Sequence, residues 1–345
     1  MSRRMAYAEL AANFFIDLYC VRTGSRKFRP LMTNFYVTKG CNLRCRYCHP
    51  PGDEPSLPVA EAVALLNKIR PHNPALNITG GEPLLYRGIL PVLRRARALG
   101  FRPLLLSTNG LLLDRVASDL HLVDHVIISL DSLQAAVNDR MCGVSGATPT
   151  VLAAIRRAAV LAREHGFLLS LHTVVAPETI DGIDNILGLC EELGAQLSLS
   201  PEHGRFDPHP ALPGNPAYRT LMDRLVTAKE QGRPVFCSAR YLRAIRDFER
   251  HGCFPLVSPR VEPDGRVYLP CQRMRRRHVY LQDYPDLVTL MQEEAEWITE
   301  PACARRCFLA CYLEVERYLR RPLTVLENVP LRNLLVRRRS AAALH

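Results

Sequence analysis

The sequence contains no long hydrophobic run. No stretch of its 345 residues approaches the ~18 to 20 consecutive apolar residues that a transmembrane helix needs. The amino terminus carries Arg3 and Arg4 but no apolar segment followed by a small-residue cleavage site, as a secretory signal would. Apolar residues make up 48% and charged residues 23%, the usual balance of a globular protein. We therefore expect a soluble, cytoplasmic protein, large enough for one barrel and a small appended domain.

Lysine is scarce. The 45 basic residues comprise 41 Arg and only 4 Lys, and the net charge is +11. This imbalance is more typical of biased codon usage than of a nucleic-acid-binding surface, because the arginines are spread along the chain. The two arginine clusters, at 275–277 and 337–339, are interpreted as a solvated face and a tail. Internal repeats and low-complexity segments are absent from the sequence. The charge therefore does not indicate a nucleic acid partner.

Cysteine, by contrast, is abundant, with 12 residues. In a reducing compartment, clustered cysteines more often bind metals than form disulfides. Eight of them fall into two groups: Cys41, Cys45 and Cys48 near the start, and Cys253, Cys271, Cys303, Cys307 and Cys311 near the end. The four isolated cysteines are interpreted as small buried apolar residues: Cys20, Cys142, Cys190 and Cys237. The grouping predicts two metal centres.

Short apolar runs alternate with amphipathic helical segments between residues 31 and 200. The predicted strands cover 31–37, 76–79, 103–107, 125–129, 167–174 and 196–200, and the predicted helices between them cover 58–70, 88–99, 112–119, 150–165 and 182–193. Six strand–helix units in series predict an α/β fold with a parallel sheet, because each parallel connection needs a crossover. We expect a partial (β/α)6 barrel with its functional residues at the carboxyl ends of the strands.

The remaining chain divides into smaller parts. We expect a helical segment at 1–30, the barrel at 31–215, an α+β extension at 216–320 with a hairpin at 261–269, and a basic tail at 321–345. In the first segment an apolar stripe (Tyr7, Leu10, Ala11, Phe14, Phe15, Leu18 and Tyr19) precedes Arg22, Arg26, Lys27 and Arg29. Such a helix either caps the open barrel or makes weak contact with an anionic membrane surface.

The first cysteine group places three thiols within eight residues, directly after the first predicted strand. Iron–sulfur clusters are bound by cysteine thiolates, and four of these would saturate a four-iron cube. Three thiolates leave one iron open for another ligand. The alternative is a zinc site that His49 would complete, although zinc sites usually take paired ligands from two separate loops.

This arrangement resembles the radical S-adenosylmethionine (SAM) superfamily, whose signature Cys-x3-Cys-x-aromatic-Cys is matched by Cys41, Cys45, Tyr47 and Cys48. The resemblance implies that the three cysteines hold a [4Fe–4S] cluster whose open iron binds SAM. It also implies that Gly80, Gly81, Glu82 and Pro83 bind the SAM amino group, with the Glu82 carboxylate as acceptor. Ser107 and Asn109 match the ribose-contacting position after the third strand, and Ser129 and Asp131 match a similar position after the fourth.

The second cysteine group resembles the twitch or SPASM extensions of radical SAM enzymes. Cys253 and Cys271 flank the predicted hairpin, and Cys303, Cys307 and Cys311 recur every four residues, on one face if helical. Five cysteines fit one auxiliary [4Fe–4S] cluster with one cysteine spare. The Cys-x3-Cys-x3-Cys spacing departs from the more usual Cys-x2-Cys, so the two ligands among the last three are not fixed. Structural zinc is the alternative.

The resemblance also implies an activity. A flavodoxin or ferredoxin-like donor would reduce the cluster, SAM would be cleaved, and a 5′-deoxyadenosyl radical would abstract hydrogen from a peptide or small-molecule substrate. The sequence indicates no catalytic residue beyond the cofactor-binding ones. Two alternatives are radical SAM enzymes with other substrates. One acts on a lipid or isoprenoid at a membrane surface, and the other acts on RNA. A non-catalytic zinc-binding protein is the alternative of another class.

Overall fold

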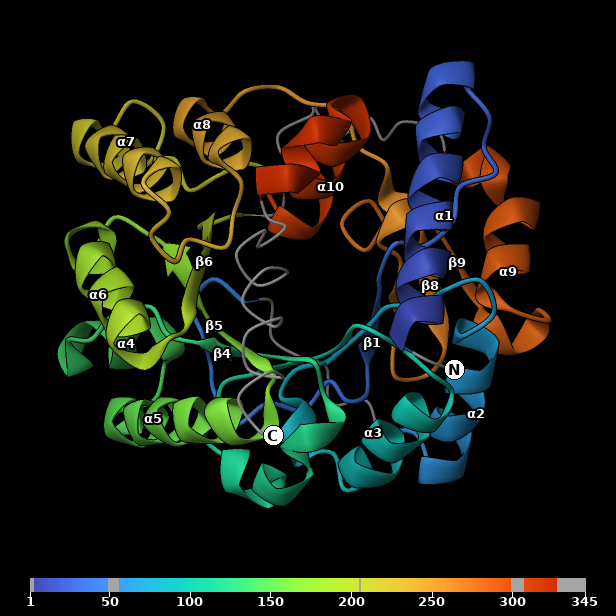
Figure 1. Cartoon of the computed structure of the whole chain (residues 1–345), viewed down its shortest axis with the longest axis horizontal. Helices are drawn as coiled ribbons and strands as arrows, with labels where there is room; N and C mark the ends of the chain where they lie inside the picture. The colour runs from blue at the N-terminus through green and yellow to red at the C-terminus, as the bar shows by residue number, and fades with distance from the viewer. Residues whose placement is uncertain (1–2, 49–55, 205, 299–306, 328–345) are drawn as a thin grey trace, which may run out of the picture.

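A seven-stranded parallel sheet forms the centre of the protein (Figure 1). The computed structural model describes residues 3–48, 56–204, 206–298 and 307–327. The strand order is β6-β5-β4-β3-β2-β1-β7 and every neighbouring pair is parallel. The strands are β1 (Thr33–Tyr36), β2 (Leu76–Thr79), β3 (Leu104–Thr108), β4 (His125–Ser129), β5 (Leu168–Val175), β6 (Gln196–Pro201) and β7 (Arg260–Val261). The six predicted strands and the partial barrel are confirmed, and β7 is an addition.

The crossover helices cover the outside of the curved sheet (Figure 1). They are α2 (Val59–Ile69), α3 (Ile89–Ala98), α4 (Ala135–Cys142), α5 (Ala147–His165) and α6 (Ile183–Leu193). The predicted helix at 112–119 is instead a pair of tighter 3-10 turns, Leu113–Arg115 and Ala117–Leu122. α4 is a helix that the sequence analysis did not predict. It ends at Gly143, which adopts the left-handed conformation with φ of +69°.

The two faces of the sheet differ in chemistry. The outer face packs apolar side chains under the helices: Phe35, Leu76, Ile78, Leu104, Leu106, Val126, Ile128, Leu171, Val175, Leu197 and Leu199. The alternate positions, which point to the inside of the barrel, are mostly polar: Asn34, Asn77, Ser107, His125, Ser170, His172, Ser198 and Ser200. The outer face therefore supplies the hydrophobic core, and the inner face carries the polar side chains of the sheet.

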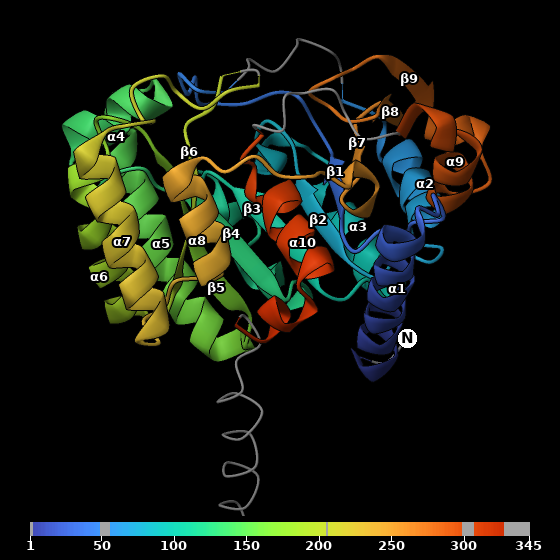
Figure 2. The ribbon, with the colours of Figure 1, turned by 90° about the horizontal axis from the view of Figure 1, so that it is seen from above.

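The segment after β6 closes the open side of the barrel. α7 (Pro216–Glu230) and α8 (Ala239–Asp247) follow β6, and α10 (Ala310–Arg320) lies between α8 and the N-terminal helix α1 (Arg3–Thr23) in both views (Figures 1 and 2). β7 comes from the same segment and pairs with β1, so the barrel's other edge is covered as well. The boundary expected near residue 215 falls between β6 and α7, but residues beyond it complete the main sheet.

The hairpin expected at 261–269 is present only as a turn. Gly265 donates its backbone N–H to the carbonyl of Glu262 at 2.9 Å and has φ of +81°, as an Asp-Gly turn requires. The strand that follows, β8 (Arg266–Leu269), pairs with β9 (Arg277–Tyr280) rather than with β7 in a hairpin ladder. One backbone hydrogen bond joins the two arms of the turn, from the Glu262 N–H to the Arg266 carbonyl at 2.8 Å, and the rest of β8 pairs with β9 instead. The β8–β9 loop carries Cys271. The helix α9 (Leu287–Glu293) follows these two strands.

The N-terminal helix α1 packs on the barrel through one face. Asn13 donates to the carbonyls of Pro30 and His72 at 2.9 and 2.8 Å, and Leu18 joins a small apolar cluster with residues of α10. The predicted apolar stripe is divided, because Phe15 and Tyr19 lie on the opposite face and are 67% and 63% exposed. Contact of this face with a membrane surface stays a prediction. Among the described residues no helix is long and apolar enough to cross a membrane.

Candidate active site

The cysteine loop begins where β1 ends, and the loop after β2 packs directly against it. The backbone N–H groups of Gly81 and Glu82 donate to the carbonyls of Thr38 and Gly40, both at 2.8 Å. A Cβ on Gly80 would lie 2.5 Å from the Thr38 oxygen, and one on Gly81 would lie 2.3 Å from the Gly40 oxygen. Both glycines are therefore needed for this close backbone approach. Contact of these glycines and of Pro83 with SAM stays a prediction.

Glu82 ties the loop after β2 to the end of β3. Its side chain is fully buried, and its carboxylate accepts hydrogen bonds from the Thr108 hydroxyl at 2.7 Å, the Asn109 N–H at 2.7 Å and the Leu84 N–H at 2.9 Å. Burial raises the pKa of Glu82, and these three hydrogen bonds oppose the rise. Its role as acceptor for the SAM ammonium stays a prediction, and its structural role is the one that the contacts show.

Asn109 brings the end of β3 to the first cysteine. Its side-chain amide donates to the Asn42 side chain at 2.8 Å, and it also hydrogen-bonds the Cys41 thiol, where it lowers a pKa that burial raises. Cys41 sulfur accepts a further hydrogen bond from the Leu43 N–H at 3.4 Å. The predicted site residue Asn109 thus lies beside the cysteine loop. Ser107, by contrast, lies on the inner face of the barrel, where it donates to Asn77 at 2.9 Å.

The unpredicted helix α4 holds the other side of the loop. The N–H of Arg44 donates to the Cys142 carbonyl at 2.9 Å, and the N–H of Arg46 donates to the Met141 carbonyl at 3.1 Å. A Cβ on Gly143 would lie 2.3 Å from the Arg44 oxygen, so only glycine fits at the end of this helix. A glycine after an apolar residue is a helix-stop signal, and Gly143 could have indicated α4.

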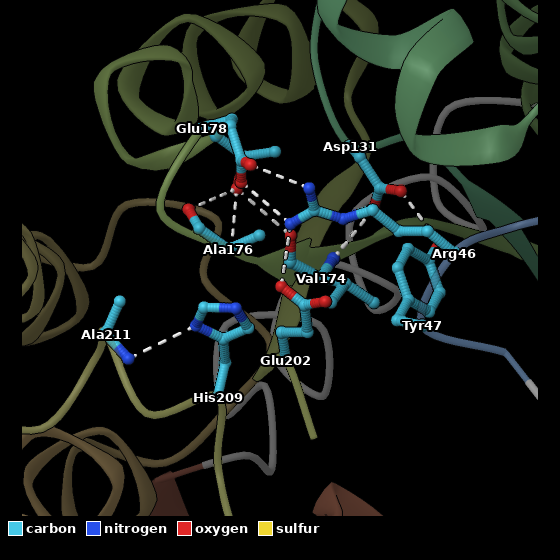
Figure 3. A network of polar contacts seen from close by, with 10 residues as sticks. Arg46, Tyr47, Asp131, Val174, Ala176, Glu178, Glu202, His209 and Ala211 are labelled. Atoms are coloured by element: carbon cyan, nitrogen blue, oxygen red, sulfur yellow. Dashed lines mark hydrogen bonds and ion pairs between the residues drawn. The ribbon is translucent and has the colours of Figure 1, made fainter. Parts of the chain in front are cut away.

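Tyr47 and Asp131, both predicted as cofactor-binding, contact each other (Figure 3). The Tyr47 hydroxyl donates to one carboxylate oxygen of Asp131 at 2.7 Å, and the Val174 N–H donates to the other at 2.8 Å. Asp131 is only 3% exposed, and burial raises its pKa to about 6. The aromatic residue of the cysteine motif is therefore fixed to the ends of β4 and β5. Ser129, at the end of β4, is exposed.

Arg46 fastens the loop to the last two barrel strands (Figure 3). Its guanidinium donates to both oxygens of Glu178 at 2.7 Å and to Glu202 at 2.9 Å. The hydrogen bond to Arg46 lowers the pKa of Glu178. Glu178 follows β5 and Glu202 follows β6. Sequence reasoning missed these partners, since nothing in the local sequence marks two acidic residues that far away as partners of Arg46.

The three thiols of the loop lie close enough to affect one another. Burial raises the pKa of Cys41, Cys45 and Cys48, and for Cys45, whose pKa rises to about 12, Asp131 and the other two thiols add to the effect. Bound metal favours the thiolates that such crowding disfavours. Among the described residues no three His, Cys, Asp or Glu side chains converge on a single-ion site. A multi-iron cluster takes each thiolate on a different iron and does not require such convergence, so the role of the three thiols as its ligands stays a prediction.

The four described cysteines of the second group lie within electrostatic range of Tyr312. Burial raises the pKa of Tyr312 well above its ordinary value, and Cys311, Cys271, Cys253 and Cys307 each add to the rise. Cys303 and His49 lie outside the described residues. α10 begins at Ala310, so Cys307 precedes it and does not share a helical face with Cys311, as the four-residue spacing suggested. The fold therefore brings distant thiols together, but not through a common helix.

The inner face of the barrel carries polar residues that the sequence analysis did not identify. Asn77 donates to Asn34 at 3.0 Å and accepts from Ser107, which links β1, β2 and β3. On the other side His172 pairs with Ser198 at 2.7 Å and lies 3.3 Å from Ser200. A similar pair joins His125 and Ser170 at 2.7 Å. Polar residues at every second position of the predicted strands were the signal for this face.

The two inner histidines are neutral. Burial lowers the pKa of both His125 and His172 to about 4, so each imidazole carries one N–H donor and one acceptor nitrogen near neutral pH. Which nitrogen carries the proton is decided by the serine partners. The inner face thus offers neutral donors and acceptors in place of charge.

Comparisons with known proteins agree with this geometry. Residues 35–190 match the family described as Radical SAM superfamily. The GTP 3′,8-cyclase of Geobacter sulfurreducens is 43% identical over 109 residues, 29% of this chain and 33% of that protein. The pre-heme d1 synthase of Dinoroseobacter shibae is 34% identical over 168 residues, 46% of this chain and 40% of that protein. The chain thus spans between a third and about half of the length of its curated relatives.

Solved structures show the same fold at low sequence identity. Streptococcus suis SuiB bound to S-adenosylmethionine superimposes with a TM-score of 0.59 at 17% identity, covering 76% of this chain and 64% of that one. Histidine-tagged anSMEcpe with bound AdoMet gives a TM-score of 0.57 at 17% identity, covering 89% of this chain and 98% of that one. The family match begins in β1 and includes the cysteine loop and the loop after β2. Residues 35–190 of the chain therefore form a domain of the radical SAM superfamily of enzymes.

Proposed function

We propose that this protein reductively cleaves SAM and uses the resulting radical to abstract hydrogen from a polar small molecule. The observation that carries the proposal is the position of the three-thiol loop, fixed at the carboxyl ends of the barrel strands directly above a polar inner face. When bound, a [4Fe–4S] cluster with one open iron would supply the electron that converts SAM to methionine and a 5′-deoxyadenosyl radical.

The residues of the chain would bind and orient the reactants. Cys41, Cys45 and Cys48 would provide the thiolates, while Glu82, Asn109 and Asp131 hold the loop in place through the contacts described above. Backbone and side-chain groups at the strand ends would bind SAM, as the family resemblance implies: Tyr47, Gly80, Gly81, Glu82, Pro83, Ser107, Asn109, Ser129 and Asp131. Most of these side chains are already immobilised by one another, so little rearrangement is needed on binding.

The inner face supports a small polar substrate. Its hydroxyl, amide and neutral imidazole groups can exchange hydrogen bonds with an uncharged polar ligand. α10 covers the open side of the barrel, which limits the space for an extended chain (Figure 2). The names GTP 3′,8-cyclase and pre-heme d1 synthase of the relatives agree with a small molecule. A peptide is the second candidate, because SuiB bound to its precursor peptide has the same fold.

The second cysteine group would hold an auxiliary [4Fe–4S] cluster. The small cavity that Cys271 and Tyr312 line supports this, since Cys311 directly precedes Tyr312 and thiols from the β8–β9 loop and α10 are thereby brought to one region. Such a cluster would position the substrate or accept an electron from it, and zinc stays the alternative occupant. A flavodoxin or ferredoxin-like protein would be the electron donor, and the cytoplasm the location.

Anaerobic reconstitution with iron and sulfide tests the proposal. Wild-type protein with dithionite and SAM should form 5′-deoxyadenosine, and Cys45→Ala should form none, because one of three ligands is lost. The control is Cys190→Ala, since Cys190 is a buried thiol that lies in α6, away from both groups. Turnover that persists in Cys45→Ala, or is lost equally in Cys190→Ala, would contradict the proposal.

A further inference from the structure

A buried ion pair lies at the junction of β7 and the turn that follows it. The Arg260 guanidinium contacts the Glu262 carboxylate at 2.6 Å, with a second hydrogen bond at 3.1 Å. The two side chains are only 19% and 1% exposed. The Arg260 guanidinium also stacks on the Tyr36 ring, 3.5 Å from its centroid. Two opposite charges are therefore held rigidly in a region with little water.

The first cysteine group lies on one side of this pair. β7 pairs with β1 so that Arg260 stands opposite Asn34, two residues before Tyr36 on the same face of β1. β1 then runs directly into the cysteine loop. The Tyr36 ring, on which Arg260 stacks, therefore lies at the start of the segment that carries the first cysteine group.

The second cysteine group lies on the other side. Arg260, Cys271 and Tyr312 line one small cavity between β7, the β8–β9 loop and α10. Cys271 belongs to the second group, and Cys311 directly precedes Tyr312 in α10. The stacked residue Tyr36 is within electrostatic range of both Cys311 and Cys48, which raise its pKa further after burial. The ion pair therefore lies between the two groups.

A charge in this position acts on any iron centre that the cysteines hold. Uptake of an electron adds negative charge, which a nearby cation favours and a nearby anion disfavours. Poor screening in a buried site makes both effects larger than at the surface. We propose that Arg260 raises, and Glu262 lowers, the reduction potential of the iron centres at both cysteine groups. This inference rests on the proposed function, and it assigns a role to two residues that the family motifs do not contain.

Redox titration of the reconstituted protein, followed by electron paramagnetic resonance, tests the inference through its sign. Arg260→Gln should lower the ratio of reduced to oxidised cluster at a fixed ambient potential by ~10-fold, which is ~59 mV for a one-electron couple. Glu262→Gln should shift the ratio in the opposite direction, because it leaves the guanidinium uncompensated. Arg260→Lys, which keeps the charge, should stay within ~2-fold of wild type. Repeating the titration with Cys41, Cys45 and Cys48 all replaced by alanine isolates the second centre.

The outcomes separate a charge effect from a structural one. A pair that only stabilises the fold would give shifts of the same sign in Arg260→Gln and Glu262→Gln, and that result would overturn the inference. If Arg260→Gln loses its iron, its reduction potential cannot be compared, and the test then depends on Glu262→Gln. An unchanged reduction potential in Glu262→Gln would also overturn the inference. Iron content and 5′-deoxyadenosine are measured on the same samples. A wild type without either refutes the proposed function and this inference together, whereas active variants with unshifted potentials refute the inference alone.

Discussion

The two cysteine groups are assembled in different ways. The first lies within eight consecutive residues, and the loop that carries it is held by the ends of β2, β3, β4, β5 and β6 and by α4. The second is gathered from separate segments, with Cys253 after α8, Cys271 in the β8–β9 loop, Cys307 just before α10 and Cys311 in its first turn. The first is a local motif on a rigid frame, while the second exists only after the chain has folded.

This difference determines what each group depends on. A local motif keeps its thiols near one another in any conformation, so the frame needs only to orient them. Bringing together cysteines from separate segments costs the conformational entropy of closing the long loops between them. The free energy of metal binding can offset this cost. We therefore expect metal to matter more for the stability of the second region than of the first.

Removing the first group should give the largest effect. With Cys41, Cys45 and Cys48 all replaced by alanine, formation of 5′-deoxyadenosine should cease. Iron should fall from about eight to about four per chain, because one of two four-iron cubes is lost. Iron analysis and visible absorbance provide the measurement. A variant that binds zinc and no iron would identify the second site as structural zinc, and one that still holds about eight irons would indicate two auxiliary clusters.

Removing one thiol of the second group should separate metal content from stability. Cys271→Ala should lose the other half of the iron and lower the melting temperature of the reconstituted protein, because ligation and folding of this region are coupled. Cys237→Ala, a change at a buried thiol outside the group, is the control. The melting temperature of each protein is measured with and without metal. If removing the metal changes the melting temperature of neither wild type nor Cys271→Ala, metal does not stabilise this region.

The frame of the first group should respond to pH through Asp131. Its folded pKa of about 6 lies above the ordinary 3.8, so the folded state binds the proton more tightly. Its contribution to stability is therefore complete below about pH 4, declines as pH rises, and is lost above about pH 6. The loss amounts to about 3 kcal/mol at most. Urea unfolding of metal-free wild type and Asp131→Asn between pH 4 and 7 measures it, and parallel curves for the two proteins would refute the assignment.

The backbone contact of Gly81 should give the smallest effect. Gly81→Ala places a Cβ 2.3 Å from the Gly40 oxygen and should cost roughly 1 to 3 kcal/mol of stability, as for other overpacked sites. Gly188→Ala is the matched control. Gly188 lies within α6 with no atom within 4 Å of the added Cβ, so alanine should stabilise by roughly 0.5 to 1 kcal/mol. Denaturant unfolding measures the free energy of unfolding of both variants. Equal changes in Gly81→Ala and Gly188→Ala would show that the contact between Gly81 and the Gly40 oxygen is not tight.

Local sequence patterns predicted the parts of the fold that local physics controls. Apolar runs gave the six barrel strands, and residue spacing gave the cysteine loop and the loop after β2. The family match confirmed the type of protein that these residues indicate. In these cases the interacting groups are either near in sequence or placed by the regular strand–helix alternation.

Contacts between distant segments could not be predicted in the same way. β7 has two residues and no strand pattern of its own, so only its pairing with β1 identifies it. The partners of Arg46 and Glu82 depend on how the strand ends converge. For the second cysteine group the spacing of Cys307 and Cys311 favoured a common helix, but the helix begins only at Ala310. The spacing of residues in the sequence limits which conformations are possible, but it does not determine at which residue a helix begins.

The pairing of β7 with β1 has a consequence for synthesis of the chain. Ser258, just before β7, hydrogen-bonds to Asn34 of β1 across 224 residues. At about 5 to 20 residues per second, a ribosome needs roughly 10 to 45 seconds to cover that distance. Throughout this interval β1 is an edge strand with unpaired backbone groups, which are a template for pairing with other chains. The segment that carries β7 therefore protects the first strand from aggregation, and a nascent chain is at risk until that segment has left the ribosome.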